Sequence, residues 1–203
     1  MTELDRSLRA IVAALTARHA RFAIVGGLAV AVRAEPRLTR DADLAVAVLH
    51  DAEAEALVAG LCSDGYHAFA AVEHETAGRL ATVRLSQPGR EFGAVTDLLF
   101  ASSGIEAEVV AEATAIEVLP GLIVPVATVG HLMVMKALAR DDRQRPADAD
   151  DLVGLAAVAG EDDWQAAIDG AALVMARGYA RGRDLVAAIE QLRANPSWSP
   201  IAE

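Results

Sequence analysis

The sequence predicts a mixed α/β fold of the α+β type, with a small mixed sheet in residues 1–127 and a helical bundle in residues 128–203. Two apolar runs, 22–25 and 44–48, flank a Gly26-Gly27 turn and a short helical stretch. That pattern is typical of a strand, a helix and a second strand. The composition shifts near residue 128, and the regular elements that we expect after it are all helices, so we expect a boundary between the two parts there.

A hairpin supports the same fold class. The strand-like runs 80–85 and 92–100 flank a Gln-Pro-Gly-Arg turn, which predicts an antiparallel pair. Asp51 and Thr128 are the expected N-caps of their helices, and Pro146 suits a first helical turn. Taken in chain order, the predicted helices cover 4–18, 27–34, 51–63, 105–113, 128–140, 146–159, 162–177 and 183–193, and the predicted strands cover 21–25, 41–48, 66–70, 80–85, 92–100 and 115–126 as two strands.

Composition narrows the class of protein. The net charge of −11 in 203 residues argues against broad, nonspecific nucleic-acid binding. Cys62 is the only cysteine, which excludes an internal disulfide and favours the cytoplasm; within an apolar run we expect it in the core. The acidic N-terminus does not resemble a signal peptide, and no run has the length of a membrane-spanning helix without a charge.

The most informative motif is a pair of acids that follows the glycine turn. Asp41 and Asp43 begin the second predicted strand, where residues two apart project to the same side. Paired carboxylates suit a hard cation such as Mg²⁺. Gly26 and Gly27, just before a helix, let backbone N–H groups approach a phosphate. A phosphate cradle beside a metal-binding acid pair is typical of a nucleotidyl-transfer site.

A third acid, Asp97, lies within the apolar run 95–100. An acid in that position is costly to bury unless it is paired or binds metal, and otherwise it is an exposed edge residue. We interpret Asp97 as the third metal ligand. Two basic groups could serve a triphosphate or a short RNA end, or could be solvated helix charges: Arg33, Arg37 and Arg40, and Lys136, Arg140, Arg143 and Arg145.

These residues resemble the nucleotidyltransferase superfamily, and more narrowly the AbiEii-type toxins of abortive-infection and toxin–antitoxin systems. The resemblance covers about residues 22–155. It rests on five features: the Gly-Gly turn, the Arg-x-Thr-x-Asp-x-Asp motif, the strand with an acid, a helix with a lysine, and an Arg-Pro-x-Asp-x-x-Asp-Leu segment. In chain order, the residues of these five features are Gly26, Gly27, Arg37, Thr39, Asp41, Asp43, Asp97, Lys136, Arg145, Pro146, Asp148, Asp151 and Leu152.

The resemblance implies residue roles. Residues 1–127 would be the catalytic core and residues 128–203 a helical region that completes the nucleotide site. The metal ligands, for two Mg²⁺ ions, would be Asp41, Asp43 and Asp97, and these would be catalytic together with Lys136. The nucleotide would be bound by Gly26, Gly27, Arg37, Thr39, Arg40, Lys136, Arg145 and Asp148.

Lys136 is the only lysine beside 17 arginines, which suggests that a compact ammonium is needed at this position. Asp148 is expected to orient Lys136 or Arg145. Asp151, one helical turn further along, either shares that face or is a solvated acid. Two departures stand out: Gly27 replaces a serine of many relatives, and Ala147 replaces a lysine common in the toxins.

The reaction that these residues predict is Mg²⁺-dependent transfer of a nucleoside monophosphate from a nucleoside triphosphate to an acceptor hydroxyl. A toxin-type enzyme would modify a transfer RNA end or a protein, and an antitoxin protein is a possible partner. Two alternatives stay open. One is a small-molecule enzyme of the antibiotic-modifying type, and the other is a degenerate module that binds nucleotide and regulates. No membrane partner is expected.

Overall fold

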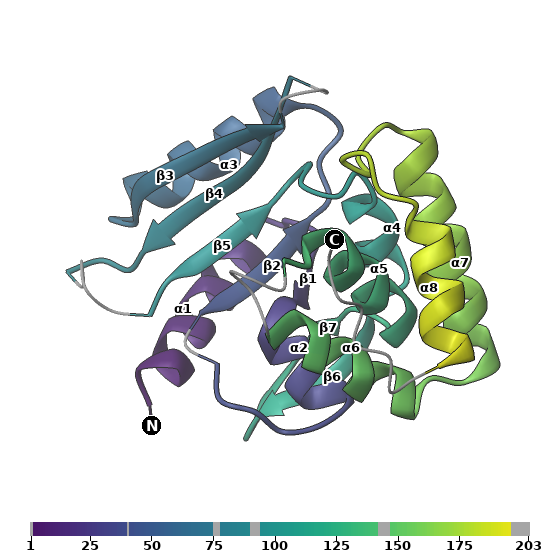
Figure 1. The fold of residues 1–203 in the computed structure, drawn as a ribbon. Coiled ribbons are helices and arrows are strands. Elements are labelled where there is room, and N and C mark those ends of the chain that lie inside the picture. The colour runs from purple at the N-terminus through teal and green to yellow at the C-terminus, as the bar shows by residue number, and fades with distance from the viewer. Residues whose placement is uncertain (1, 40, 75–77, 90–93, 142–146, 196–203) are drawn as a thin grey trace.

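The computed structural model describes residues 2–39, 41–74, 78–89, 94–141 and 147–195 (Figure 1). In these ranges the chain forms one mixed sheet with helices around it, which confirms the predicted fold class. The strands are β1 Phe22–Val25, β2 Ala42–Val46, β3 His67–His74, β4 Arg79–Ser86, β5 Thr96–Leu99, β6 Thr114–Leu119 and β7 Leu122–Val126. The helices are α1 Glu3–Ala17, α2 Gly26–Arg33, α3 Asp51–Ser63, α4 Glu106–Ala111, α5 Val129–Ala139, α6 Ala147–Val158, α7 Glu161–Ala176 and α8 Leu185–Ala194.

The seven strands lie in the order β3-β4-β5-β2-β1-β7-β6. Strand β2 pairs antiparallel with β1 and parallel with β5, and β1 pairs parallel with β7. The β4–β5 hairpin is antiparallel, as predicted, and the two strands expected in residues 115–126 form a second antiparallel hairpin, β6–β7. The motif strands β1 and β2 are therefore central, because a crossover brings β5 beside β2.

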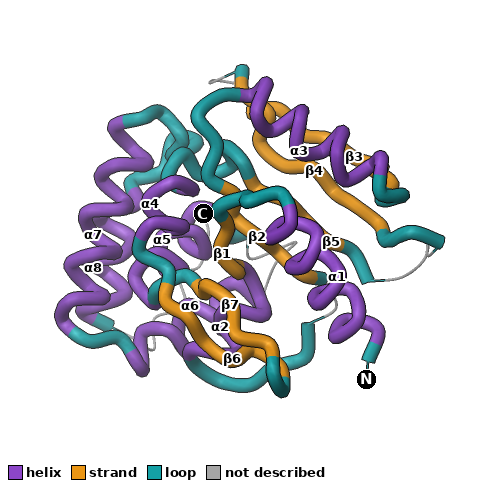
Figure 2. The backbone as a smooth tube through the Cα atoms, turned by 180° about the vertical axis from the view of Figure 1, so that it is seen from behind, coloured by secondary structure: helices purple, strands orange, loops and turns teal. Residues whose placement is uncertain are grey.

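Two helices cover one face of the sheet. Figure 2 shows α1 and α3 in front of the half of the sheet that contains β2 to β5. Helix α1 turns Leu8, Ile11 and Leu15 inward with no exposed surface, which agrees with their helical spacing in the sequence. This layer leaves the opposite face of β2 and β5 to the site and to the C-terminal helices.

The C-terminal part is helical, as predicted, and α5 lies at its centre. Helix α5 packs against α2, α6, α7 and α8. Residues on every side of it are buried, including Leu132, Met133 and Val134, so its apolar composition reflects burial all round rather than one apolar face. Thr128 is its N-cap and accepts from the backbone N–H of His131, as predicted. No helix in the described ranges is long and apolar enough to cross a membrane.

Two local predictions are wrong. His50, not Asp51, is the N-cap of α3: its ring accepts from the backbone N–H of Glu53. Asp51 instead accepts from the Arg79 guanidinium and the Leu80 backbone. Cys62 is exposed rather than in the core, because α3 buries only its Ala54 and Leu61 positions.

Candidate functional site

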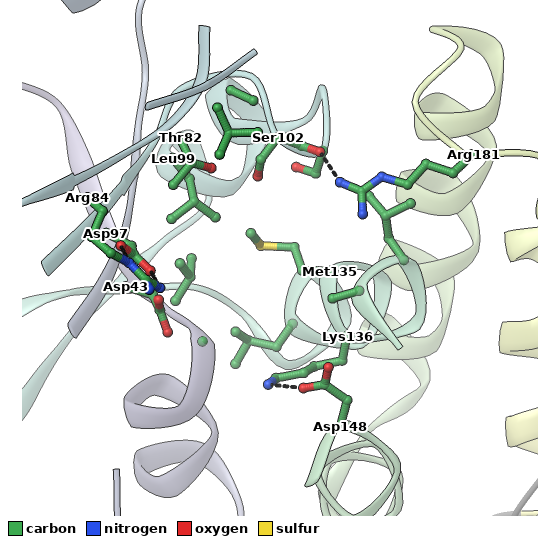
Figure 3. Close-up of a pocket in the computed structure, with 18 of the residues that line it drawn as sticks. Asp43, Thr82, Arg84, Asp97, Leu99, Ser102, Met135, Lys136, Asp148 and Arg181 are labelled. Atoms are coloured by element: carbon green, nitrogen blue, oxygen red, sulfur yellow. Dashed lines mark hydrogen bonds and ion pairs between the residues drawn. The ribbon is translucent and has the colours of Figure 1, made fainter. Parts of the chain in front are cut away.

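Four residues lie in one row across the sheet. The strand registers place Val25 opposite Asp43, Asp43 opposite Asp97 and Asp97 opposite Arg84, from β1 through β2 and β5 to β4. Directly paired residues in a sheet project to the same face. Figure 3 shows the side chains of Asp43, Asp97 and Arg84 close together on one wall of a cavity. The structure therefore brings two of the three predicted metal ligands together.

The glycine turn lies against this row. Gly26 follows Val25 directly and has φ +63°, in the left-handed region that favours glycine. A Cβ at Gly26 would lie 1.9 Å from the Asp43 Oδ2 atom. Position 26 therefore needs a glycine for two reasons: its φ angle is positive, and a Cβ would collide with the Asp43 side chain.

Gly27 has a different neighbour. A Cβ there would lie 2.6 Å from an Arg37 guanidinium nitrogen and 3.2 Å from the Thr39 hydroxyl oxygen. A serine at position 27 would have to displace Arg37 in this arrangement. The absence of a side chain at Gly27 thus lets a guanidinium lie over the N-terminal end of α2, where a helix favours anions.

Asp97 forms an ion pair whose partner could not be identified from the sequence. Its two carboxylate oxygens accept from Arg84, Oδ1 from Nε at 2.8 Å and Oδ2 from Nη2 at 2.7 Å. These hydrogen bonds raise the pKa of the Arg84 guanidinium above its ordinary value, and the charges of Asp41 and Asp43 act in the same direction. Asp41 thus lies close enough to share the electrostatic field of the row.

Asp41 is positioned by the loop before β2. It is partly buried, and its backbone carbonyl accepts from the Thr39 hydroxyl at 3.2 Å. Asp43, two residues further along, is also partly buried and lines the cavity. Thr39 therefore supports the acid pair through the backbone.

Lys136 belongs to a buried charge network between α5, α6 and the motif loop. Its Nζ atom lies 2.6 Å from an Asp148 oxygen and 2.7 Å from an Asp151 oxygen. Asp151 also binds Arg37 through Nε at 2.7 Å and Nη2 at 2.9 Å. The Asp151 side chain is only 2% exposed. Asp148 thus contacts Lys136, one of the two cations that it was expected to orient, and the burial of Asp151 excludes the solvated alternative for that residue.

The sheet row and Lys136 face the same cavity, which has a volume of about 460 Å³ (Figure 3). Its charged lining residues come from both parts of the chain and are Asp43, Arg84, Asp97, Lys136, Asp148 and Arg181. The remaining wall is largely apolar, with hydroxyls at Thr82, Ser102 and Ser103. A pocket of this size and mixed lining is suited to a small polar ligand with an apolar portion.

One loop of this cavity is held by a buried acid that sequence reasoning missed. Glu106 is 3% exposed, and its Oε1 atom accepts from the backbone N–H groups and hydroxyls of both Ser102 and Ser103, at 2.7–3.1 Å. The Ser-Ser-Gly-Ile-Glu stretch carries a signal, because a serine followed three residues later by a glutamate is typical of a helix N-terminus, although the N-cap of α4 is Ile105. This loop therefore has a defined shape where it borders the cavity.

Some predicted basic residues have other positions. Arg33 does not line the cavity; it donates to the carbonyls of Val126 and Ala127 and to the Thr114 hydroxyl, so it holds the end of β7. Arg40 and Arg145 lie outside the described residues. Their nucleotide-binding roles stay predictions.

The donor chemistry of the acids around the start of β2 suits a divalent cation in part. Asp41 and Asp43 offer carboxylate oxygens, which Mg²⁺ prefers. In the described part of the chain, no three His, Cys, Asp or Glu side chains are arranged as a metal-holding cluster. The acid pair therefore fits a cation, while the Asp97 carboxylate is held by Arg84.

A scan against protein-family models finds no match, and a search of curated proteins finds none either. Among solved structures, the chain is similar to ANT(2'')-Ia in complex with adenylyl-2''-tobramycin, with 18% identity, a TM-score of 0.48 and coverage of 94% of this chain and 98% of that chain. The solution structure of the same antibiotic-resistance factor gives 22% identity, a TM-score of 0.45 and coverage of 92% and 91%.

JHP933 from Helicobacter pylori is similar at 18% identity and a TM-score of 0.46, with coverage of 95% of this chain and 88% of that chain. All three TM-scores lie below 0.5. These likenesses therefore do not establish the activity or the substrate of this chain.

Proposed function

We propose that this chain is a nucleotidyltransferase that moves a nucleoside monophosphate from a nucleoside triphosphate to an acceptor hydroxyl. The observation that carries the proposal is the row in which Asp43 and Asp97 lie side by side, with Gly26 against Asp43 and Lys136 facing the same cavity. A helix N-terminus, carboxylates and an ammonium around one pocket match the needs of phosphoryl transfer, which depends on positioning and charge.

In the proposed reaction, the acceptor hydroxyl oxygen forms a bond to the α-phosphorus. The bond from that phosphorus to the bridging oxygen breaks, and pyrophosphate leaves with the electron pair. The proton of the hydroxyl passes to a base, for which Asp97 is the proposed candidate. The acceptor becomes a phosphodiester, so the products account for every atom.

The residues of this chain bind and orient the triphosphate. The backbone N–H groups at Gly26 and Gly27 begin α2 and favour negative charge. Arg37 lies beside Gly27 and adds a fixed guanidinium. Lys136, held by Asp148 and Asp151, offers an ammonium at the cavity wall that can offset charge developing on the leaving group.

Mg²⁺ ions would be held by Asp41 and Asp43, with Asp97 as a further ligand. Bound divalent cations stabilise the entering and leaving oxygens of such a displacement. The proposed division of labour assigns residues 1–127 to the catalytic core and residues 128–203 to completion of the nucleotide site. The lining of one cavity by Asp43 from the first part and Lys136 from the second supports that division.

We place a transfer RNA end or a protein first as acceptor, in keeping with the resemblance to AbiEii-type toxins, and an antitoxin would then be a partner. The second candidate function is transfer to a small molecule. The cavity volume of about 460 Å³ favours this candidate, because it falls in the range of small-ligand sites.

The test is transfer of label from each of four α-labelled triphosphates, with Mg²⁺, with and without total transfer RNA, and with a panel of small hydroxyl acceptors. The Asp41→Asn/Asp43→Asn double variant should lose transfer. Asp162→Asn, an exposed acid on α7, is the matched control and should retain it.

Label on RNA or on protein would support the toxin-type enzyme, and label on a small molecule would support the second candidate. Transfer that survives in the double variant would refute the metal assignment. Triphosphate binding without transfer to any acceptor would instead indicate a regulatory module.

A further inference from the structure

We infer that Arg84 competes with a divalent cation for Asp97, so that metal binding at this row requires the guanidinium to leave that carboxylate. The inference deepens the proposed function. It rests on that function in one respect, because it needs a metal site at Asp43 and Asp97. It concerns how a cation gains access to Asp97. The presence of the three acids does not by itself determine that access.

Arg84 engages both carboxylate oxygens of Asp97. Arg84 and Asp97 lie directly opposite each other on β4 and β5, and the contact is bidentate at 2.8 and 2.7 Å. Both carboxylate oxygens of Asp97 are thereby engaged by a planar donor pair, which is the strong form of this ion pair. A cation that uses Asp97 as a ligand would meet the guanidinium within the same few ångströms.

Burial shows which partner is free to move. The Asp97 side chain is 12% exposed, whereas the Arg84 side chain is 45% exposed and also lines the cavity. Asp97 is thus held in the sheet, and Arg84 approaches it from the open side. The long arginine stem can swing into the cavity without any change in the backbone.

The local charge also favours competition. Asp43 and Asp97 lie in one row with Arg84, and Asp41 lies two residues before Asp43. The three carboxylates carry three negative charges, and the guanidinium already neutralises one of them, so a cation that enters this row meets a weaker negative field. A positive charge fixed next to that cation is unfavourable, so Arg84 should lower the affinity of the row for metal.

The experiment is calorimetric titration of Mn²⁺ into the full chain without triphosphate, with free Mn²⁺ followed in parallel by electron paramagnetic resonance. Arg84→Gln should bind Mn²⁺ about tenfold more tightly than the unaltered chain, the order expected for removing a unit charge a few ångströms from a dication at high effective dielectric. Arg84→Lys should fall between the two. Arg79→Gln, on the same strand but paired with Asp51, is the matched charge control and should bind as the unaltered chain does.

Unchanged or weaker Mn²⁺ binding by Arg84→Gln would overturn the inference. Asp43→Asn separates it from the proposed function, because Mn²⁺ binding that survives this change would show that the row is not the metal site at all. A second measurement uses the unaltered chain: the Nε–H signal of Arg84 in a nuclear magnetic resonance spectrum should shift when Mg²⁺ is added. A signal that stays in place at saturating Mg²⁺ would contradict the competition.

Discussion

Replacement of Asp151 by asparagine tests the buried charge network most directly. Asp151 receives Arg37 through two nitrogens, at 2.7 and 2.9 Å, and the Lys136 ammonium at 2.7 Å. Its side chain is 2% exposed, so almost no water is available to replace a lost partner. An asparagine has nearly the same shape, but it removes the charge and turns one acceptor oxygen into a donor.

The expected loss follows from what is left behind. Removing one partner of a buried ion pair commonly costs 3–5 kcal/mol, because the other charge stays buried and unbalanced. Lys136 keeps Asp148 at 2.6 Å, and the Arg37 side chain is 33% exposed, so both cations retain some compensation. We therefore expect the free energy of unfolding to fall by about 3 kcal/mol, which corresponds to a Tm about 6–12 °C lower for a chain of this size.

The assay is urea unfolding followed by circular dichroism, with the Tm measured in parallel. Glu161→Gln is the control, because it makes the same change in a pair with Arg193 whose side chains are 74% and 41% exposed. That pair should be worth about 0.5 kcal/mol or less. A loss below about 1 kcal/mol in Asp151→Asn would refute the reasoning that burial makes this network a major contributor.

Two further predictions concern a glycine and a histidine. Gly26→Ala should destabilise the fold by more than Gly121→Ala in urea unfolding: both positions have positive φ, but only the Cβ at Gly26 meets Asp43, and equal losses would contradict the clash. Burial lowers the pKa of His131 below its ordinary value of 6.5. The unfolded chain therefore binds the proton more tightly, so stability should fall as the pH drops from about 6.5 through the folded-state pKa. His131→Gln should flatten this dependence between pH 7.5 and 5.5, and an unchanged slope would assign the dependence to other groups.

The motif at the centre of the chain was predictable because it is local. The apolar runs around Gly26 and the acids at Asp41 and Asp43 predicted a strand, a helix and a strand, and the structure has β1, α2 and β2 there. The N-cap at Thr128 follows equally from neighbouring residues. In each case the deciding interactions lie within a few residues.

The pairing of Arg84 with Asp97 could not be predicted from the sequence. Its position opposite Asp97 depends on the register of β4 and β5, and the connection from Ser86 to Thr96 is too long for a turn type to set that register. Asp97 itself was singled out because an acid in an apolar strand needs compensation. The compensating partner in this structure is Arg84, and a metal role for Asp97 stays a prediction.

Asp151 and Cys62 show that the burial of a side chain could not be predicted from the sequence either. The sequence left Asp151 either on the same helix face as Asp148 or as a solvated acid, and the packing of α6 against α5 buries it beside Lys136. Cys62 lies in an apolar run, yet α3 turns it outward. Periodicity predicts a helix, but which side faces the core depends on the elements that pack against it.

The sequence by itself determined the fold class, the strand–turn–helix–strand motif, the hairpins and the helical C-terminal part, because backbone stereochemistry and apolar periodicity act over short distances. Only the tertiary structure decided the sheet order that brings Asp43 beside Asp97, the guanidinium that occupies Asp97 and the two acids that hold Lys136. Those contacts join residues far apart in the chain, and the balance between desolvation and ion pairing that sets them exists only once the chain has packed.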